Sequence, residues 1–200
     1  MSGIPDEELM MRFQQGSAHA FELLFEKYRC PVFTFLCRML GQQRAAAEDL
    51  LQEVFVRVAK AKELYEPRAR FSTWLFTVAR NHCINFIRSR RYLQNSVSLS
   101  MDEAPEGPGS SLADRLPGAE DGATAVARSD LQAELEHAIC ALPTAYREAF
   151  LLHAVEGFSH EEAARILDLK PATVRTHFHR ARGMLRESMK GTFPEYGGQE

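Results

Sequence analysis

Residues 159–186 follow the pattern of two helices joined by a tight turn, which limits the chain to folds that contain such a helix pair. Ser159 and Glu162 have the spacing of a capping box, in which a hydroxyl and a carboxylate each bind a free backbone N–H at a helix start. Residues 168–170 supply the turn, and Pro171 suits the first position of the next helix because it has no N–H to leave unpaired. The sequence therefore predicts a helix-turn-helix.

The second helix of this pair has an apolar side and a cationic side. Its apolar stripe consists of Val174, Phe178, Ala181 and Leu185. The positions of this helix outside the stripe include Arg175, Thr176, His179, Arg180, Arg182 and Arg186. A helix packed on one side and cationic on the other fits the major groove of DNA. A solvated surface helix would look similar on its own, but the capped helix and three-residue turn before it favour DNA binding.

Helical periodicity also dominates the rest of the chain. Apolar residues recur every three or four positions over 5–91, and no sustained two-residue alternation indicates a strand. Residues 96–127 instead hold five Ser, four Gly and three Pro. We expect an all-α protein of two small helical domains, 1–95 and 128–192, joined by a flexible acidic linker and followed by a short tail at 193–200.

The charges are unevenly distributed. The 200-residue chain has a net charge of −3, which argues against an indiscriminate polyanion binder. Residues 1–95 hold 14 basic and 10 acidic side chains, residues 96–127 one Arg and six acids, and residues 128–200 9 basic and 11 acidic side chains. Residues 170–190 alone hold six basic residues and one acid, where the DNA-reading helix is predicted. The linker could reach roughly 100 Å when extended, so two DNA-contacting domains could sit several helical turns apart.

Two segments of the first domain carry polar side chains in informative positions. In residues 48–55, Asp49, Gln52 and Glu53 fall on the side of a helix opposite its apolar residues. Such a face could dock a partner helix, although periodicity alone favours a solvated face.

The second segment, residues 68–81, interleaves aromatic residues with Arg, Thr and Asn, as a single-stranded nucleic-acid platform would. We expect most of Phe71, Trp74, Leu75 and Val78 to be core. The side chains then expected to be exposed are Arg70, Thr73, Arg80, Asn81 and Arg88.

No residue pattern indicates a cofactor or a metal site. The cysteines are Cys30, Cys37, Cys83 and Cys140, and they form no C-x-x-C pair. Cys30 and Cys37 could share a helix face, but a buried apolar role is the more common one for cysteine. No signal peptide precedes the first helix and no apolar run approaches about 18 residues, so we expect a cytoplasmic protein without membrane insertion.

The sequence also bears on two other functional classes. An enzyme or metalloprotein is disfavoured because His177 and His179 diverge by about 200° on a helix, and because residues 160–162 lack the second His of a zinc-protease motif. No nucleophile pair or glycine-rich phosphate loop is evident. The alternative is a conventional helix-turn-helix regulator, with residues 1–95 as a ligand or dimerisation domain. It predicts tight duplex binding by the isolated protein.

The chain resembles the extracytoplasmic-function (ECF) sigma factors, small bacterial promoter-recognition subunits of RNA polymerase. The resemblance covers both predicted domains and omits the linker and the ends. Its motifs are EDLLQEVF at 48–55, FSTWLFTVARN at 71–81, LP at 142–143, GFSHEEAA at 157–164 and TVRTHFHRAR at 173–182. Each motif alone is weakly specific for this family, but their occurrence in this order is strongly specific for it.

This resemblance implies a role for each segment. Asp49, Gln52 and Glu53 match the surface that binds the β′ clamp helices of the polymerase core. A sigma factor also contacts the β flap of the core. The loop at 64–71 and the helix after it match the reader of the promoter −10 region, where an unpaired base is captured. The −10 residues would be Arg70, Thr73, Arg80, Asn81 and Arg88.

The second helix of the helix-turn-helix matches the −35 reader, and its DNA-facing positions hold Arg175, Thr176, His179 and Arg180. The resemblance also implies an anti-sigma factor as a partner. Lys170 departs from the family where a small capping residue is common, and Ala172 replaces a frequent Gly. The acidic linker is long for this class, and we hypothesise that it occupies the template-strand path of the polymerase.

Overall fold

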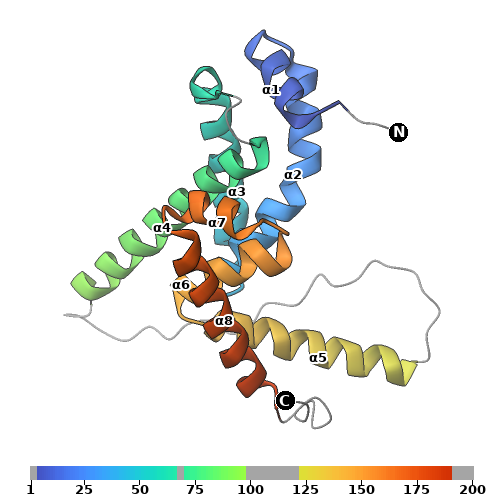
Figure 1. Ribbon diagram of the computed structural model, residues 1–200, viewed down its shortest axis with the longest axis vertical. Coiled ribbons are helices and arrows are strands. Elements are labelled where there is room, and N and C mark those ends of the chain that lie inside the picture. The colour runs from blue at the N-terminus through green and yellow to red at the C-terminus, as the bar shows by residue number, and fades with distance from the viewer. Residues whose placement is uncertain (1–3, 67–69, 98–121, 191–200) are drawn as a thin grey trace.

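The computed structural model describes residues 4–66, 70–97 and 122–190, and every regular element within these ranges is a helix (Figure 1). The prediction of an all-α protein is confirmed. The elements are α1 (Asp6–Gln14), α2 (Ala18–Met39), α3 (Arg44–Lys60), the short η1 (Lys62–Leu64), α4 (Phe71–Val97), α5 (Gly122–Ala141), α6 (Thr144–Phe150), the π-helical η2 (Leu151–Val155), α7 (His160–Leu167) and α8 (Pro171–Ser188).

The N-terminal half, residues 4–97, packs α1 to α4 around an apolar core. The hydroxyl of Ser17 caps α2 by accepting the backbone N–H of Ala20 at 3.4 Å. The helix continues through Pro31 and ends before Gly41, whose φ of +65° lies in the left-handed region that favours glycine. The large side chains fully buried in this half include Met10, Leu24, Phe35, Leu36, Phe71 and Phe76.

The C-terminal half, residues 122–190, contains the predicted helix-turn-helix as α7 and α8. The capping box is present: the Ser159 hydroxyl accepts the Glu162 N–H at 3.1 Å, and the Glu162 carboxylate accepts the Ser159 N–H at 2.9 Å. Asp168 ends α7 with φ 54° and ψ 49°, and Pro171 begins α8. Lys170, at the N-cap of α8, makes no capping hydrogen bond with its side chain, as the departure from the family pattern predicts.

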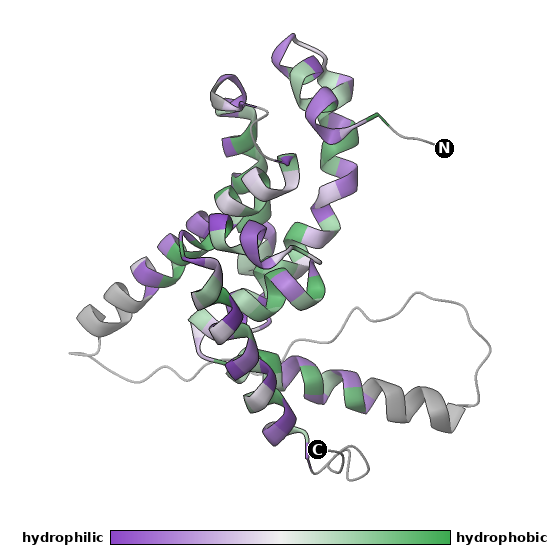
Figure 2. Ribbon diagram, viewed as in Figure 1, coloured by the Kyte–Doolittle hydropathy of each residue, from purple (hydrophilic) through white to green (hydrophobic). Residues whose placement is uncertain are grey.

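The two halves are packed against each other, although two domains on a flexible linker were expected to be separate. α4 contacts α7, and α2 contacts both α5 and α6. Phe76 of α4 meets Phe158 edge-on, with ring centroids 5.1 Å apart, and both are buried. Figure 2 shows hydrophobic residues concentrated where the helices meet in the middle of the molecule. One continuous apolar core therefore links the halves.

The boundaries predicted for the linker were also wrong at both ends. α4 continues to Val97 and α5 already begins at Gly122, so each helix enters the segment 96–127. Residues 122–127 include three alanines, which have the highest helix propensity, and the acidic and polar composition of the whole segment concealed them. Residues 98–121, the remaining part of that segment, lie outside the described residues, as does the tail from 191.

Candidate nucleic-acid and polymerase interface

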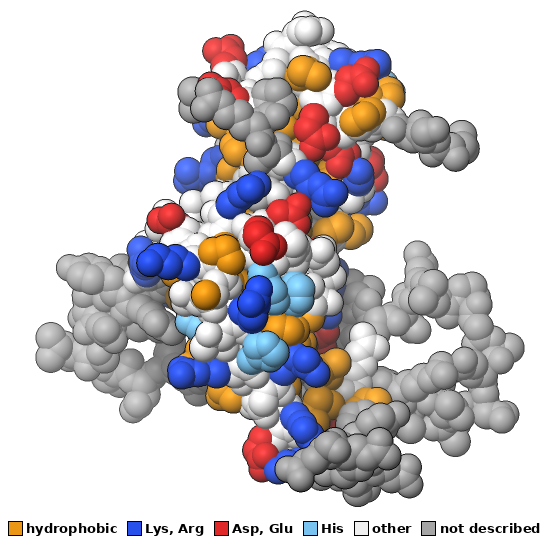
Figure 3. Space-filling model, in the orientation of Figure 1, with side chains coloured by type: hydrophobic (Ala, Val, Ile, Leu, Met, Phe, Trp, Pro, Cys, Tyr) orange, Lys and Arg blue, Asp and Glu red, His pale blue; other side chains and the backbone are white. Residues whose placement is uncertain are grey.

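α8 presents its polar side to solvent. Of its predicted apolar stripe, Val174, Ala181 and Leu185 are buried, and Phe178 is partly buried against Phe150 and His153. All four predicted DNA-facing residues are exposed, namely Arg175, Thr176, His179 and Arg180. In Figure 3, basic and histidine side chains gather over α7 and α8. A capped supporting helix thus holds a cationic helix in a position where it can enter a groove.

Two further contacts show how this surface is organised. The guanidinium of Arg180 donates to the Tyr146 hydroxyl of α6 at 3.0 Å. Behind α8, the rings of His153 and His160 stack with centroids 4.0 Å apart. The pKa of His160 is lowered, first by burial and then by neighbouring His153 and Arg175.

The acidic face of α3 is positioned as predicted. Leu50 and Val54 are buried, while Asp49, Gln52 and Glu53 are exposed on the opposite side. Glu53 pairs with the ring of His82 on α4, at 2.5 Å between Nε2 and Oε2. Val56 lies on the same side of α3 as these polar residues and is 51% exposed. An apolar side chain within a polar helix face is typical of a surface that docks a partner.

The start of α4 is largely core, as predicted for its aromatic residues. Phe71 and Leu75 are fully buried, and the Tyr65 and Trp74 rings meet edge-on at 5.3 Å. Thr73, however, was wrongly expected to be exposed, because only 4% of its surface is accessible. The reason is that α4 is covered on two sides, by α2 and α3 and by α7, so its buried face is wider than one apolar stripe.

The remaining predicted −10 residues differ in their surroundings. Arg70 is 75% exposed and pairs loosely with Glu162, at 3.4 Å. Asn81 and Arg88 are exposed. Arg80 was also expected to be exposed, but its guanidinium is held by Glu148 of α6 at 2.7 Å and its side chain is only 21% exposed. Glu148 belongs to none of the motifs read from the sequence.

No cluster of three or more potential metal ligands occurs among the residues that the structure describes. Cys30 is exposed whereas Cys37 is buried, so these two do not share one environment. Burial is the main cause that raises the pKa of Cys37 to about 11 and of Cys83 to about 12, so both stay as neutral thiols near neutral pH. Within the described part of the chain, no helix combines the length and apolar character needed to cross a membrane.

The geometry sets apart two exposed surfaces, the cationic side of α8 and the polar face of α3, and comparison with known proteins identifies the family. Residues 24–92 match the family model of Sigma-70 region 2, and residues 132–185 match that of Sigma-70 region 4. RNA polymerase sigma factor CarQ of Myxococcus xanthus is 34% identical over 89% of this chain and 94% of its own length. ECF RNA polymerase sigma factor SigW of Bacillus subtilis is 31% identical over 88% of this chain and 92% of its own length.

Solved structures agree with the fold. CnrH in complex with the cytosolic domain of CnrY gives a TM-score of 0.67 at 23% identity, covering 93% of this chain and 97% of that one. RpoE of Bartonella quintana, in complex with the anti-sigma factor NepR, gives a TM-score of 0.65 at 26% identity, covering 85% of this chain and 96% of that one. The chain belongs to the ECF sigma factors, which direct RNA polymerase to promoters at transcription initiation. Sigma factors are initiation factors rather than enzymes, and the conventional regulator is not favoured.

Proposed function

We propose that the two domains divide promoter recognition between them. Residues 1–95 bind the core polymerase and read and open the −10 region, and residues 128–192 read the −35 element. The core-binding residues are Asp49, Gln52 and Glu53, which meet the β′ clamp helices. The −10 residues are Arg70, Arg80, Asn81 and Arg88, and the −35 residues are Arg175, Thr176, His179 and Arg180.

One observation carries this proposal: α8 exposes four polar side chains on one side, while Val174, Ala181 and Leu185 on its apolar stripe are buried. Arginine can pair with a guanine through two hydrogen bonds, and each such pair discriminates by about 1–3 kcal/mol. Contacts to phosphates set the register of the helix in the groove. Arg175 and Arg180 are therefore the proposed base readers, and Thr176 and His179 complete the surface.

Promoter opening by this protein would proceed without ATP. Moving one base out of the stack costs a few kcal/mol, which a fitted pocket and phosphate contacts can offset. A chain with net charge −3 binds promoter DNA weakly on its own, so core polymerase supplies the remaining affinity. We propose that the protein acts by binding alone, in the cytoplasm, with the β flap as a second core contact and an anti-sigma factor as its regulator. RpoE of Bartonella quintana, similar to this chain, is held by such a partner.

A reconstitution tests the proposal. Purified core polymerase, this protein and a genomic DNA library would be mixed, and the transcript starts mapped. We expect starts that share a bipartite upstream motif and that are absent without the protein. Asp49→Ala and Glu53→Ala should weaken core binding more than they weaken use of the upstream element. If the protein neither binds core polymerase nor changes where transcription starts, the proposal is wrong.

A further inference from the structure

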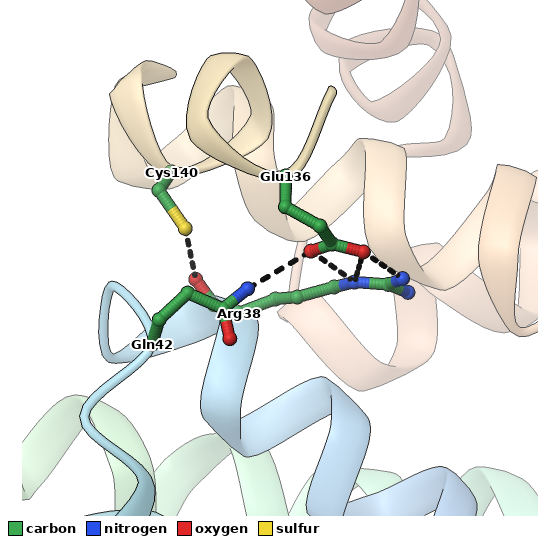
Figure 4. Close-up of polar contacts among 4 residues, drawn as sticks. All are labelled: Arg38, Gln42, Glu136 and Cys140. Atoms are coloured by element: carbon green, nitrogen blue, oxygen red, sulfur yellow. Dashed lines mark hydrogen bonds and ion pairs between the residues drawn. The ribbon is translucent and has the colours of Figure 1, made fainter. Parts of the chain in front are cut away.

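The two ends of α2 have different surroundings. At its C-terminal end, Arg38 pairs with Glu136 of α5 at 2.5 Å, and Gln42, just beyond the helix, donates to the same carboxylate (Figure 4). Its N-terminal part carries α1, which packs against α2, η1 and α4, all in the N-terminal half. In Figure 1, α1 lies at the top of the view, whereas α5 and α8 lie toward the bottom. The contacts that α1 makes with these three elements therefore do not depend on the C-terminal half.

Gln14, the last residue of α1, holds two backbone carbonyl groups next to the predicted −10 loop. Its side-chain amide donates to the carbonyl oxygen of Lys62 at 2.6 Å and to that of Tyr65 at 3.0 Å. One amide nitrogen has two N–H groups, so it can serve both acceptors. Lys62 also places its ammonium group 5.1 Å from the centroid of the Phe13 ring. The end of α1 is thus joined to η1 and to the first residues of the loop at 64–71.

Glu7, near the other end of α1, binds the start of α4. Its carboxylate oxygen Oε1 accepts the backbone N–H of Phe71 at 2.9 Å. The first N–H groups of a helix have no partner within the helix and carry partial positive charge. Glu7 satisfies one of them with a side chain from a different helix. Because Phe71 directly follows Arg70, this hydrogen bond fixes the backbone beside a proposed −10 residue.

Asp6 anchors α1 itself on α2. Its carboxylate accepts hydrogen bonds from Nζ of Lys27, at 2.6 and 2.7 Å, and from the hydroxyl of Tyr28, at 2.6 Å. Leu9 and Met10 of α1 are buried. The position of α1 is therefore set by α2, so Glu7 and Gln14 reach the loop from a helix that is fixed independently of it.

The spacing of Glu7 and Gln14 suits the two sides of the loop. They are seven positions apart, which is nearly two helical turns and about 10 Å along the axis, so both lie on one side of α1. One holds the backbone of Tyr65 and the other that of Phe71. Residues 67–69, between these two points, lie outside the described residues. A single helix therefore sets the distance between the backbone segments before and after them.

Aromatic packing joins the same two segments through their side chains. Tyr65 is buried, and its ring meets the rings of Phe71 and Trp74 edge-on, with centroids 6.0 and 5.3 Å apart. Phe71 also meets Tyr28 of α2 edge-on, at 5.4 Å. Rings can slide over one another at little cost, whereas hydrogen bonds depend on direction. The contacts of Glu7 and Gln14 therefore supply the directional part of this support.

We propose that Glu7 and Gln14 are positioning residues for −10 recognition. They hold the backbone on both sides of the loop, and so hold Arg70 and the start of α4 in the arrangement that meets the promoter. The inference rests on the proposed −10 role of this region and adds two residues that act without touching DNA. Recognition of a base depends on such support, because a binding group that is displaced loses its hydrogen-bond geometry.

The test uses single substitutions in the full-length protein. Gln14→Met removes the two donors and keeps the length of the side chain, and Gln15→Met makes the same change at the adjacent exposed position as the matched control. Glu7→Ala removes the acceptor, whereas Glu7→Gln keeps a carbonyl oxygen that can accept the same N–H. Glu8→Ala removes an equal charge one position further on, where the carboxylate pairs with Arg12 on the surface.

The readout is the ability of the polymerase complex to discriminate at each promoter element, on a promoter found in the reconstitution. The −10 discrimination is the ratio of the rates of open-complex formation on this promoter and on a copy with one −10 base pair changed, and the −35 discrimination is measured likewise. We expect Gln14→Met and Glu7→Ala to lower the −10 discrimination by about threefold to tenfold, as the loss of one or two hydrogen bonds would. The −35 discrimination and core affinity should stay unchanged, because they depend on α8 and on the polar face of α3.

The other variants separate positioning from a general structural role. Glu7→Gln should keep most of the −10 discrimination, and Gln15→Met and Glu8→Ala should keep all of it. Circular dichroism checks that the helices are retained, and if Gln14→Met loses helix content, the comparison of Glu7→Ala with Glu7→Gln decides.

The possible results distinguish this inference from the proposed function. If the wild-type protein discriminates at −10 and both Gln14→Met and Glu7→Ala do so equally well, only the positioning role is wrong. It is also wrong if these variants lower the −35 discrimination by the same factor, or if the control substitutions have the same effect. If the wild-type protein discriminates at −35 but not at −10, the proposed −10 role is wrong and the positioning role falls with it.

Discussion

Arg175 and Arg180 are exposed side chains on a helix that is anchored by the buried Val174, Ala181 and Leu185, so replacing either should leave the fold intact. We predict that Arg175→Ala or Arg180→Ala costs about 1–3 kcal/mol of discrimination between the correct upstream element and a mutated one. Competition binding of the polymerase–sigma complex to the two promoters measures this. Core affinity should stay unchanged, and equal losses on both promoters would contradict a base-reading role.

Glu156 is a partly buried acid just after η2 whose charge the fold disfavours. Burial raises its pKa from 4.5 to about 7, and nearby Arg38 opposes this only in part. Between these pH values the folded protein holds a proton that the unfolded chain has released. Stability from this group is therefore complete below about pH 4.5 and is lost as the pH rises through about 7.

Glu156→Gln, which stays neutral, should remove that decline and make the protein more stable than wild type above pH 7. Urea unfolding followed by circular dichroism, at pH values on both sides of the window, measures the difference. A variant that keeps the wild-type pH dependence would show that Glu156 is already ionised in the folded protein.

Prediction from sequence at the residue scale succeeded where one helix face decides exposure. The polar sides of α3 and α8 each face solvent, so periodicity located Asp49 and Arg175 correctly. It failed for Thr73 and Arg80, because α4 is covered from two directions and the second cover comes from a distant segment. No local pattern around Arg80 indicates its partner, which lies 68 residues away.

At the element scale, α7 depends on its N-terminal cap, because the helix has only eight residues. We predict that Ser159→Ala lowers the free energy of unfolding by about 1 kcal/mol, since the backbone N–H of Glu162 loses the hydroxyl that accepts it. Ser89→Ala, at an exposed position within α4, is the control and should change stability by less than about 0.5 kcal/mol. Urea denaturation of both variants measures the difference, and equal midpoints would contradict the prediction.

Elements with strong end signals could be predicted from the sequence, whereas those without them could not. The capping box, the turn before Pro171 and the glycine after α2 each have a local physical cause that a short motif displays. The start of α5 adjoins an acidic, glycine-rich stretch, so Asp121, whose residue type is common at an N-cap, does not stand out from its neighbours there. The alanines that follow indicate a helix only through their propensity, which is a weaker signal.

At the scale of the whole molecule, Arg147 contacts the ends of two helices from different halves. We predict that Arg147→Ala destabilises the protein by about 3 kcal/mol, because several buried carbonyls lose a charged donor. Arg147→Lys should recover part of this loss, since lysine keeps the charge but lacks the planar fork. Thermal unfolding of the three proteins checks the order, and an alanine variant as stable as wild type would contradict it.

The separation of the chain into two domains followed from composition, but their packing did not. The sequence shows a glycine- and serine-rich segment between two helical regions, which indicates a boundary and says nothing about whether the regions touch. Contact depends on pairs such as Phe76 with Phe158 and Arg38 with Glu136, which are far apart in the chain. Their complementarity becomes visible only in three dimensions.

The 68 residues that separate Arg80 from Glu148 also impose a delay during protein synthesis. At bacterial translation speeds of about 5–20 residues per second, the ribosome needs roughly 3–14 s to make the carboxylate after it has made the guanidinium. The amino-terminal region emerges and folds before the C-terminal half that covers Arg80 has been synthesised. The nascent chain therefore passes through an interval in which its arginines are accessible to any nearby nucleic acid. A slowly translated codon late in the mRNA would lengthen that interval.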